Sequence, residues 1–397
     1  MRKYLPQLGV ELAVLTTGGQ EAEQGIFRIR DFTPDTCFKL AYYSVRLLHK
    51  LATALNSYHS VHEVWKRRVK NRAEDIIKQF HPSIVIATYP PIETLELGLF
   101  FSENYDLPLV ADFRDGMLFE PIQSQALQNP CAHRYYQGIE RRVAERSKLL
   151  ITVSPVLTEY FCATYPQVNA ITIPNGYDPS DSSNDEITQM FDEGRINVVY
   201  TGNLGLSDAG CQINGLLGAL NRLAREPFYC NRLRVHLAGR LSPREKHDLG
   251  GLIAQGLIRY HGLLPREQCL ALQKSGDILL LITSLSRSSV ATGKLFEYLL
   301  AGKPILALTA GTFAESIVLS TGTGWVVHPQ SEEEIYRFFT LILSDPDFAK
   351  GLNRQEQEIE KYSCVEQMRL LGEWLHRVCQ DGPMISPDGA EISHTAP

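Results

Sequence analysis

Residues 293–304 read Gly-Lys-Leu-Phe-Glu-Tyr-Leu-Leu-Ala-Gly-Lys-Pro and lead into the apolar run Ile-Leu-Ala-Leu at 305–308. At 100° per residue, the leucines and the phenylalanine fall on one side of a helix, and Lys294 and Glu297 fall on the other. Gly302 ends this helix, and a strand follows the proline. A cation and a carboxylate one turn apart suit a ligand with phosphate and hydroxyl groups. The alternative is an ion pair between the two on a solvated face, worth a few tenths of a kcal/mol.

The length of the chain indicates two domains. At 397 residues it exceeds the usual limit for a single core, so two domains of roughly 190 residues each are expected. The composition is 44% hydrophobic and 21% charged, with a net charge of −6. These values are typical of a globular protein, and they favour neither a disordered chain nor a nucleic-acid partner.

The charge is unevenly distributed along the chain. Residues 1–80 hold 13 Lys and Arg against 8 Asp and Glu, a net of +5, and the remainder holds 26 against 37, a net of −11. Much of the positive excess lies at 66–72, Lys-Arg-Arg-Val-Lys-Asn-Arg. Such a cluster can contact an anionic membrane or a lipid phosphate. It is equally compatible with a solvated helix face.

The spacing of the cysteines and the length of the apolar runs indicate the cellular compartment in which the protein is expected. The eight cysteines form no C-x-x-C pair and no regular spacing, which disfavours a zinc site or a disulfide scaffold and fits a reducing environment. No apolar run approaches the roughly 20 residues of a membrane span, and the first residues do not resemble a signal peptide. We expect a cytoplasmic protein, with peripheral contact at the inner face of the plasma membrane left open by the basic cluster.

Short apolar runs alternate with helix-length amphipathic segments along the whole chain. This alternation predicts parallel sheets covered by helices on both faces. The strand candidates are 10–16, 83–88, 108–113, 149–153, 170–173, 196–200, 233–238, 257–260, 277–282, 304–308 and 324–327. A polar, turn-rich stretch at 178–186 interrupts the pattern and marks a domain boundary.

We therefore predict an α/β protein with two Rossmann-like, doubly wound parallel-sheet domains. Ligands of such folds bind at the carboxyl ends of the strands. The predicted parts are a first domain at 1–180, a linker at 181–194, a second domain at 195–354, a helix at 355–378 that packs back on the first domain, and a disordered tail at 379–397. The chain opens with a helix-like segment, so the first sheet is expected to lack its N-terminal strand, and Met1 is hypothesised to be an internal position of a longer protein.

Seven short motifs then occur in a characteristic order. They are Ala-Thr-Tyr-Pro-Pro at 87–91, Val-Ala-Asp-Phe-Arg-Asp at 110–115, Ile-Thr-Val-Ser-Pro at 151–155, Ile-Pro-Asn-Gly-Tyr-Asp at 173–178, Tyr-Thr-Gly-Asn-Leu-Gly at 200–205, Tyr-His-Gly at 260–262 and the stretch 293–304. In this order and spacing the chain resembles GT-B glycosyltransferases of family 4 (group 1), of the bacterial surface-polysaccharide type. The resemblance covers about residues 1–378.

The resemblance implies a nucleotide-sugar donor site in the second domain. The turn containing Gly202, Asn203 and Gly205 would face the donor diphosphate, because glycines let backbone N–H groups approach a phosphate at a helix end. Lys294 would neutralise the leaving diphosphate, and Glu297 matches the second glutamate of the family's Glu-x7-Glu motif, which holds the ribose. The sequence departs from this motif at Ser289, where the first glutamate would stand. Arg240 and Arg287 are further candidates for the diphosphate site, or are simply solvated.

In the first domain the resemblance assigns the acceptor side to Asp112, Arg114 and Asp115, which close a strand. Two carboxylates around an arginine can position a sugar hydroxyl. The alternative is an Arg–Asp network that only pins the loop. Residues 345–347, Asp-Pro-Asp, resemble a metal-binding D-x-D but lie after a late helix, and we interpret them as a structural turn.

These motifs predict a glycosyltransferase that moves a hexosyl unit from a nucleoside-diphosphate sugar to a glycan or lipid-linked acceptor. The resemblance implies retention of the anomeric configuration, no metal, and no cofactor other than the donor substrate. Two alternatives remain. One is a non-catalytic nucleotide-sugar-binding or scaffold protein, which the missing first glutamate and the missing first strand both favour. The other is a GT-B sugar epimerase, which requires a carboxylate or histidine set that the sequence does not reveal.

Overall fold

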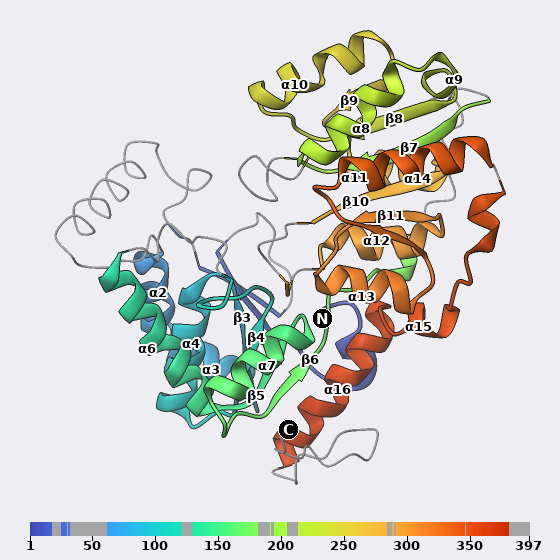
Figure 1. Cartoon of the computed structure of the whole chain (residues 1–397). Helices are drawn as coiled ribbons and strands as arrows, with labels where there is room; N and C mark the ends of the chain where they lie inside the picture. The colour runs from blue at the N-terminus through green and yellow to red at the C-terminus, as the bar shows by residue number, and fades with distance from the viewer. Residues whose placement is uncertain are drawn as a thin grey trace. The chain divides into compact units, whose positions relative to one another are not determined.

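The structure is a computed structural model that describes residues 1–17, 25–29, 31, 62–120, 129–181, 191, 194–204, 213–283, 288–289, 291–345 and 347–380. The chain divides into two compact units (Figure 1). One unit comprises Met1–Ile173 together with the chain from Met368 onward, and the other comprises Pro174–Gln367. The division therefore falls before the polar stretch at which the sequence predicts a boundary.

A parallel sheet with helices on both faces forms the centre of the first unit. Its described strands are β3 (Val85–Tyr89), β4 (Leu109–Phe113), β5 (Ser147–Thr152) and β6 (Ala170–Thr172), in the order β3-β4-β5-β6. Its helices are α2 (Glu63–Asn71), α3 (Ala73–Phe80), α4 (Ile92–Tyr105), α6 (Pro130–Arg146), α7 (Pro155–Thr164) and α16 (Cys364–Gln380). A short 3-10 helix, η1 (Leu5–Leu8), precedes them.

The side chains of β4 alternate between the two faces of this sheet, as a strand buried on both faces requires. Ala111 and Phe113 pack with α4, α6 and α7. Val110 packs instead with Leu149 of β5 and with the apolar side of α16. All five residues of β4 are buried, so the polar Asp112 at its end is held inside a hydrophobic strand.

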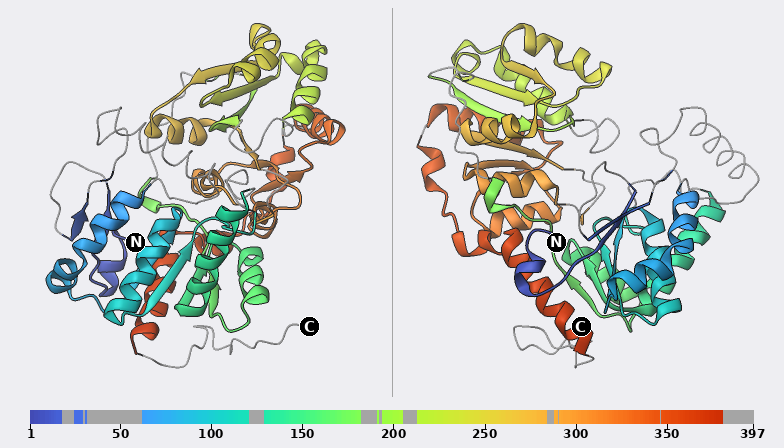
Figure 2. Two further views of the ribbon diagram at one scale, coloured as in Figure 1. Left: turned by 90° about the vertical axis from the view of Figure 1, so that its left-hand side faces the viewer. Right: turned by 180° about the vertical axis from the view of Figure 1, so that it is seen from behind.

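The strand predicted at 10–16 is much shorter than expected. It contains only β1 (Val14–Thr16), which pairs in parallel with β2 (Ile26–Arg28) in a separate two-stranded sheet (Figure 2). Within the described residues, β1 makes no ladder with β3 to β6. The four-stranded sheet accordingly begins at β3.

The second unit contains a larger parallel sheet with the order β12-β11-β10-β7-β8-β9 among its described strands. The strands are β7 (Ile196–Thr201), β8 (Leu233–Ala238), β9 (Ile258–Gly262), β10 (Ile278–Ile282), β11 (Ile305–Leu308) and β12 (Gly324–Val327). Counted along the chain, this is the 3-2-1-4-5-6 order of dinucleotide-binding sheets. The direction of the connections reverses between β7 and β10, and ligands bind outside the carboxyl ends of the strands at such a switch point.

Helices cover both faces of this second sheet (Figure 2). Val198 and Tyr200 of β7 face α8 (Asn214–Ala224) and α14 (Glu332–Ser344), whereas Val199 faces the opposite layer. The remaining elements are η2 (Pro179–Asp181), α9 (Pro227–Cys230), α10 (Pro243–Ala254), α11 (Arg266–Ser275), α12 (Gly293–Ala301), α13 (Phe313–Ser320), η5 (Phe348–Gly351) and α15 (Glu356–Glu360).

The helix predicted at 355–378 is divided into two helices, α15 and α16. Between them the chain pairs with Tyr177, whose N–H donates to the Tyr362 carbonyl at 3.0 Å and whose carbonyl accepts from the Cys364 N–H at 2.8 Å. This parallel bridge uses backbone groups that a continuous helix would need for itself. The second part, α16, runs to Gln380, beyond the predicted end, and the rest of the expected tail lies outside the described residues.

The prediction of an α/β fold with parallel sheets is confirmed. No helix in the described parts of the chain combines the length and apolar character needed to cross a bilayer.

Candidate functional site

Two glycines shape the carboxyl edge of β7 and β8. Gly202 follows β7 with a φ of 135°, and Gly239 follows β8 with a φ of 145°. L side chains rarely adopt these values. The two backbones touch, because a Cβ on Gly239 would lie 2.1 Å from the Gly202 oxygen. The Gly202 N–H donates to the Ala238 carbonyl at 2.7 Å. The backbone conformation therefore favours glycine at both positions, and the close backbone approach requires it at Gly239.

Lys294, in the first turn of α12, lies over Gly202. A Cβ on Gly202 would lie 2.7 Å from its Nζ. The Nζ donates a 3.3 Å hydrogen bond to the Tyr200 hydroxyl and lies 5.1 Å from the centre of that ring. Among the described residues no carboxylate comes within the 4.0 Å of an ion pair, so Lys294 does not form the pair with Glu297 that was the alternative. Burial lowers the pKa of Lys294.

Among the described residues, no side chain caps the start of α12 either. Thr292 is the N-cap residue, but its side chain caps no backbone N–H, and its buried Oγ1 has no hydrogen-bond partner among the described residues. A helix N-terminus carries a partial positive charge and N–H groups that anions bind readily. Lys294 and this helix end together form an electropositive position at the edge of the sheet.

Glu297 lies one turn further along α12, and its carboxylate accepts hydrogen bonds at both oxygens. Oε1 accepts from Arg266 Nη1 at 2.9 Å, and Oε2 accepts from Gln273 Nε2 at 3.0 Å. Its side chain is 25% exposed. The same Gln273 nitrogen donates to Thr201 Oγ1 at 2.8 Å, which connects Glu297 with the end of β7. Glu297 is therefore close to the Gly202 turn without touching Lys294.

Asn203 and Arg240 complete this edge. The Arg240 N–H donates to Asn203 Oδ1 at 2.7 Å, and the Tyr200 hydroxyl donates to the Asn203 carbonyl at 3.3 Å. The Arg240 side chain is exposed. Of the predicted donor residues, the structure thus brings Gly202, Asn203, Arg240, Lys294 and Glu297 to one edge of the second sheet. Two other candidates, Gly205 and Arg287, lie outside the described residues, and Ser289 is buried.

The predicted acceptor residues lie at the corresponding edge of the first unit's sheet. Asp112 is 1% exposed and pairs with Arg114 at 3.3 Å, and Thr88 Oγ1 donates to its other oxygen at 3.3 Å. Arg114 also donates to the Ile173 carbonyl at 3.2 Å. Burial raises the pKa of Asp112, and Arg114 partly offsets this. The Arg–Asp network that was the structural alternative is therefore formed, and Asp115 follows it at a half-buried position.

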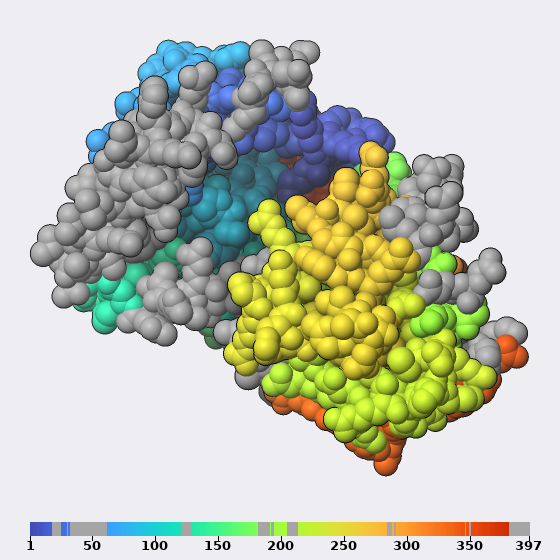
Figure 3. All heavy atoms as spheres, turned by 90° about the horizontal axis from the view of Figure 1, so that it is seen from above, coloured from blue at the N-terminus to red at the C-terminus, as the bar shows by residue number. Residues whose placement is uncertain are grey.

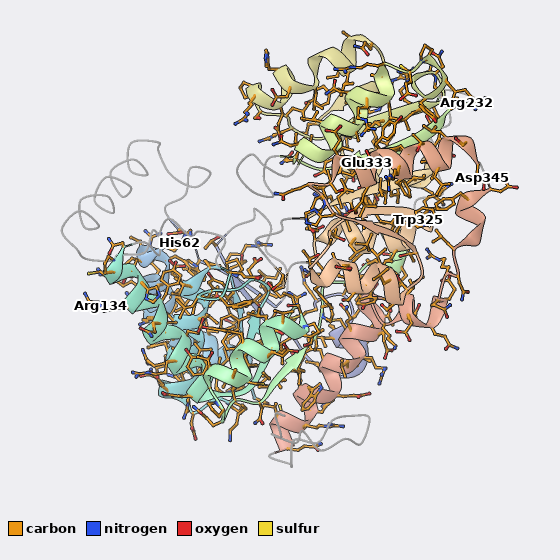
Figure 4. All side chains as sticks on the ribbon, in the orientation of Figure 1. His62, Arg134, Arg232, Trp325, Glu333 and Asp345 are labelled. Carbon is orange, nitrogen blue, oxygen red and sulfur yellow. The ribbon has the colours of Figure 1, made fainter. Side chains whose placement is uncertain are left out.

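Several buried charged groups of the first unit could not be predicted from the sequence. Asp31 is buried and accepts from His62 Nδ1 at 2.5 Å; Figure 4 labels His62 beside α2. Glu93, in the first turn of α4, is also buried, and burial raises its pKa. Glu140 of α6 accepts from the Tyr160 hydroxyl at 2.7 Å. Each partner is at least 20 residues distant, and no local pattern reveals such contacts.

The basic cluster at 66–72 is divided between a buried and an exposed part. Lys66 is buried and bonds Glu63 and Glu96, each at 2.8 Å. Arg67, Arg68 and Lys70 are exposed on α2. A solvated helix face thus accounts for most of the cluster.

The Asp-Pro-Asp sequence lies after α14, where Figure 4 labels Asp345. The Asp347 N–H donates to Asp345 Oδ1 at 3.0 Å, as in a turn. Within the described residues no group of three or more His, Cys, Asp or Glu side chains is placed to hold a metal ion.

Comparison of the sequence with protein-family models and with curated proteins found no match. Solved structures of similar fold were found. Sucrose-phosphate synthase from Thermosynechococcus elongatus is 15% identical with a TM-score of 0.62, over 91% of this chain and 86% of that one. Alr3699/HepE from Anabaena, in complex with UDP, is 14% identical with a TM-score of 0.58, over 92% and 100%. UDP-GlcNAc 2-epimerase from Neisseria meningitidis, bound to UDP-GlcNAc, is 14% identical with a TM-score of 0.52, over 80% and 82%.

These similarities establish the fold. The chain has an α/β fold with parallel sheets that matches the fold of these solved structures. At such low identity they do not establish the activity, which has to be argued from the residues at the edges of the two sheets.

Proposed function

We propose that the protein is a glycosyltransferase that moves a hexosyl unit from a nucleoside-diphosphate sugar to a glycan or lipid-linked acceptor. The observation that carries this proposal is Lys294. It is a half-buried cation without a described carboxylate partner, it lies over Gly202, and it stands at the start of α12, which the N-cap residue Thr292 does not cap. Burying an uncompensated charge is unfavourable, so an anionic ligand at this position would supply the missing partner.

The donor site would divide the nucleotide among the residues at this edge. The diphosphate would lie against Gly202, Lys294 and the start of α12, where backbone N–H groups and the cation stabilise the charge of the leaving group. Asn203 and Arg240 would border the same site, and Gly205 is proposed to contribute to it on the sequence motif alone. Glu297 would accept hydrogen bonds from the ribose. UDP is the donor nucleotide best supported, since two of the similar structures contain UDP or UDP-GlcNAc.

The acceptor would bind to the first unit through Asp112, Arg114 and Asp115. Following the resemblance, transfer would retain the anomeric configuration without a metal. The bond between the anomeric carbon and the diphosphate oxygen breaks, the acceptor oxygen bonds to that carbon, and the acceptor proton passes to the departing diphosphate. The exposed arginines of α2 would support peripheral contact of a cytoplasmic protein with an anionic membrane surface.

A GT-B sugar epimerase is the second candidate, and one observation favours it. Asp31 bonds His62 in the first unit, where Glu93 is also buried, and these residues would supply the carboxylate or histidine set that an epimerase requires. Epimerisation moves a proton on the sugar ring and needs groups of this kind. A non-catalytic scaffold, the third alternative, would bind the nucleotide without turning it over.

A thermal-shift screen against UDP-, GDP-, ADP- and CDP-sugars, followed by analysis of the sugar product, tests the proposal. We expect stabilisation by one nucleotide class and release of its diphosphate. An epimerised sugar still attached to the nucleotide would identify the epimerase, and binding without turnover would identify a scaffold. The absence of any stabilisation would contradict all three.

A further inference from the structure

Two side chains of α11 hold the carboxylate of Glu297. Arg266 begins this helix and Gln273 lies seven residues later, a spacing that places both on one side of a helix. Arg266 Nη1 donates to Glu297 Oε1 at 2.9 Å, and Gln273 Nε2 donates to Glu297 Oε2 at 3.0 Å. Each carboxylate oxygen therefore has its own donor, and the orientation of the group is fixed from α11.

Both donors are themselves held in place. Arg266 Nη2 donates to Asp181 Oδ2 at 2.7 Å, so its guanidinium lies between two carboxylates. Gln273 is 1% exposed, and its amide nitrogen also donates to Thr201 Oγ1 at 2.8 Å. Thr201 directly precedes Gly202. This amide thus connects Glu297 of α12 to the turn at the end of β7.

Stability of the fold alone does not account for a glutamine at this position. The buried Gln273 Oε1 has no hydrogen-bond partner among the described residues. An unmade hydrogen bond on a buried group is unfavourable, and an apolar side chain of similar size would avoid it. The polar residue is therefore better explained by what its nitrogen does to Glu297 and Thr201.

The arrangement leaves the carboxylate able to bind a diol. A carboxylate oxygen has two lone-pair positions, and α11 occupies one on each oxygen. No other described residue bonds these two oxygens, so the second position on each remains for a hydroxyl donor. Two neighbouring hydroxyl groups, such as the 2′ and 3′ groups of a ribose, match two acceptors held at a fixed spacing. A receptor group that is already oriented loses less conformational entropy on binding.

We propose that Gln273 and Arg266 are positioning residues that orient Glu297 to accept both ribose hydroxyls of a nucleoside diphosphate. This inference rests on the proposed function, because it takes the edge of the second sheet to be the donor site. Gln273 acts through Glu297, and its contribution should depend on the presence of the ribose hydroxyls.

Calorimetric titration with UDP and with 2′,3′-dideoxy-UDP tests the assignment. Gln273→Glu places a second carboxylate beside Glu297 Oε2, and Gln273→Met removes the donor without adding charge. We expect the affinity for UDP to fall about tenfold in Gln273→Glu and in Arg266→Gln. In Gln273→Met the affinity for UDP should fall by a smaller factor. Arg225→Gln, which removes an exposed arginine at the end of α8, is the matched control and should leave the affinity unchanged.

The dideoxy analogue separates positioning from a general structural effect. The unaltered protein should bind it more weakly than UDP, and the α11 variants should bind it as well as the unaltered protein does. An equal loss for both ligands, or no loss for UDP, would overturn the positioning role. Equal binding of UDP and its analogue by the unaltered protein would overturn the diol assignment while leaving the proposed function standing. Where the thermal-shift screen identifies another nucleotide class, that nucleoside diphosphate and its 2′,3′-dideoxy analogue replace UDP; binding of none of the four classes would overturn both the positioning role and the proposed function. Should Gln273→Glu not fold, Gln273→Met and Arg266→Gln test the same expectation.

Discussion

The carboxyl edges of the two parallel sheets differ in whether their charged side chains are paired with an opposite charge. In the first unit, Asp112 at the end of β4 is paired with Arg114 and bonded by Thr88. In the second unit, Lys294 beside the end of β7 has the Tyr200 hydroxyl as its hydrogen-bond partner and no described carboxylate within ion-pair distance. At the first edge the charge of Asp112 is neutralised by Arg114. At the second edge the charge of Lys294 has no described partner, and an anionic ligand would neutralise it. This difference identifies the second edge as the better candidate for an anion site.

Substitution of Lys294 should give the largest effect. Lys294→Ala removes the cation that faces the diphosphate, and we expect turnover of the donor to fall about a hundredfold, or about 2.7 kcal/mol. Steady-state kinetics measure this loss. The matched control is Lys246→Ala, which removes an exposed lysine of α10, a helix that belongs to the yellow region of the surface in Figure 3. Equal rates in the two variants would remove Lys294 from the site.

Substitution of Asp112 should mainly affect stability. Asp112→Ala leaves the half-buried Arg114 without its described carboxylate, and we expect the free energy of unfolding to fall by about 2–3 kcal/mol. Urea denaturation measures this change. The control is Glu103→Ala, which breaks the exposed pair with Arg142 and should cost less than about 1 kcal/mol. A fully stable Asp112→Ala variant with impaired transfer would instead make Asp112 a substrate-binding group.

Gly202→Ala should lower both the stability of the fold and the affinity for UDP, each by a smaller amount. The φ of 135° disfavours alanine, and its Cβ would push against Nζ of Lys294. We expect a loss of about 1–3 kcal/mol in the free energy of unfolding, together with weaker UDP binding. Gly293→Ala is the control for stability, because its Cβ would meet no atom within 4 Å. Similar melting temperatures for the two variants would contradict the tight packing at Gly202.

The smallest predicted effect is an increase in stability on removal of the Lys294 charge, whereas the preceding substitutions lower stability or activity. Burial lowers the pKa of Lys294, so the unfolded chain binds more protons between that lowered pKa and the usual 10.5. The contribution of Lys294 to stability therefore rises with pH across this window and is unfavourable below it. Lys294→Met should raise the free energy of unfolding by about 0.5–1 kcal/mol at pH 7, as seen on thermal denaturation. A Lys294→Met variant that is less stable than the unaltered protein would show that other groups of the protein already compensate the charge of Lys294.

Sequence patterns predict the framework of the second unit well. The apolar runs at 277–282, 304–308 and 324–327 are found as β10, β11 and β12. All residues of β10 and β11 are buried, and a strand buried on both faces is apolar throughout. Lys294 and Glu297 could likewise be assigned to the polar side of one helix. Their partners could not, since Arg266 and Gln273 come from another helix and meet Glu297 only after the sheet has formed.

Features that depend on long-range contacts were less predictable. In the second unit, the interruption between α15 and α16 depends on a bridge to Tyr177. In the first unit, the pairing of β1 with β2 is likewise non-local. The contact of His62 with Asp31 spans two segments that no periodicity connects. Long-range polar contacts of this kind leave no signature in the local sequence pattern.

Proton uptake on binding of UDP tests most directly whether Lys294 receives the diphosphate. Titrations are performed at alkaline pH, between the lowered pKa of Lys294 and 10.5, in buffers with different ionisation enthalpies. A bound diphosphate favours the charged lysine and raises its pKa, so the account predicts net proton uptake by the unaltered protein and none by Lys294→Ala. UDP binding with the same proton uptake in both proteins, or with none in either, would contradict it.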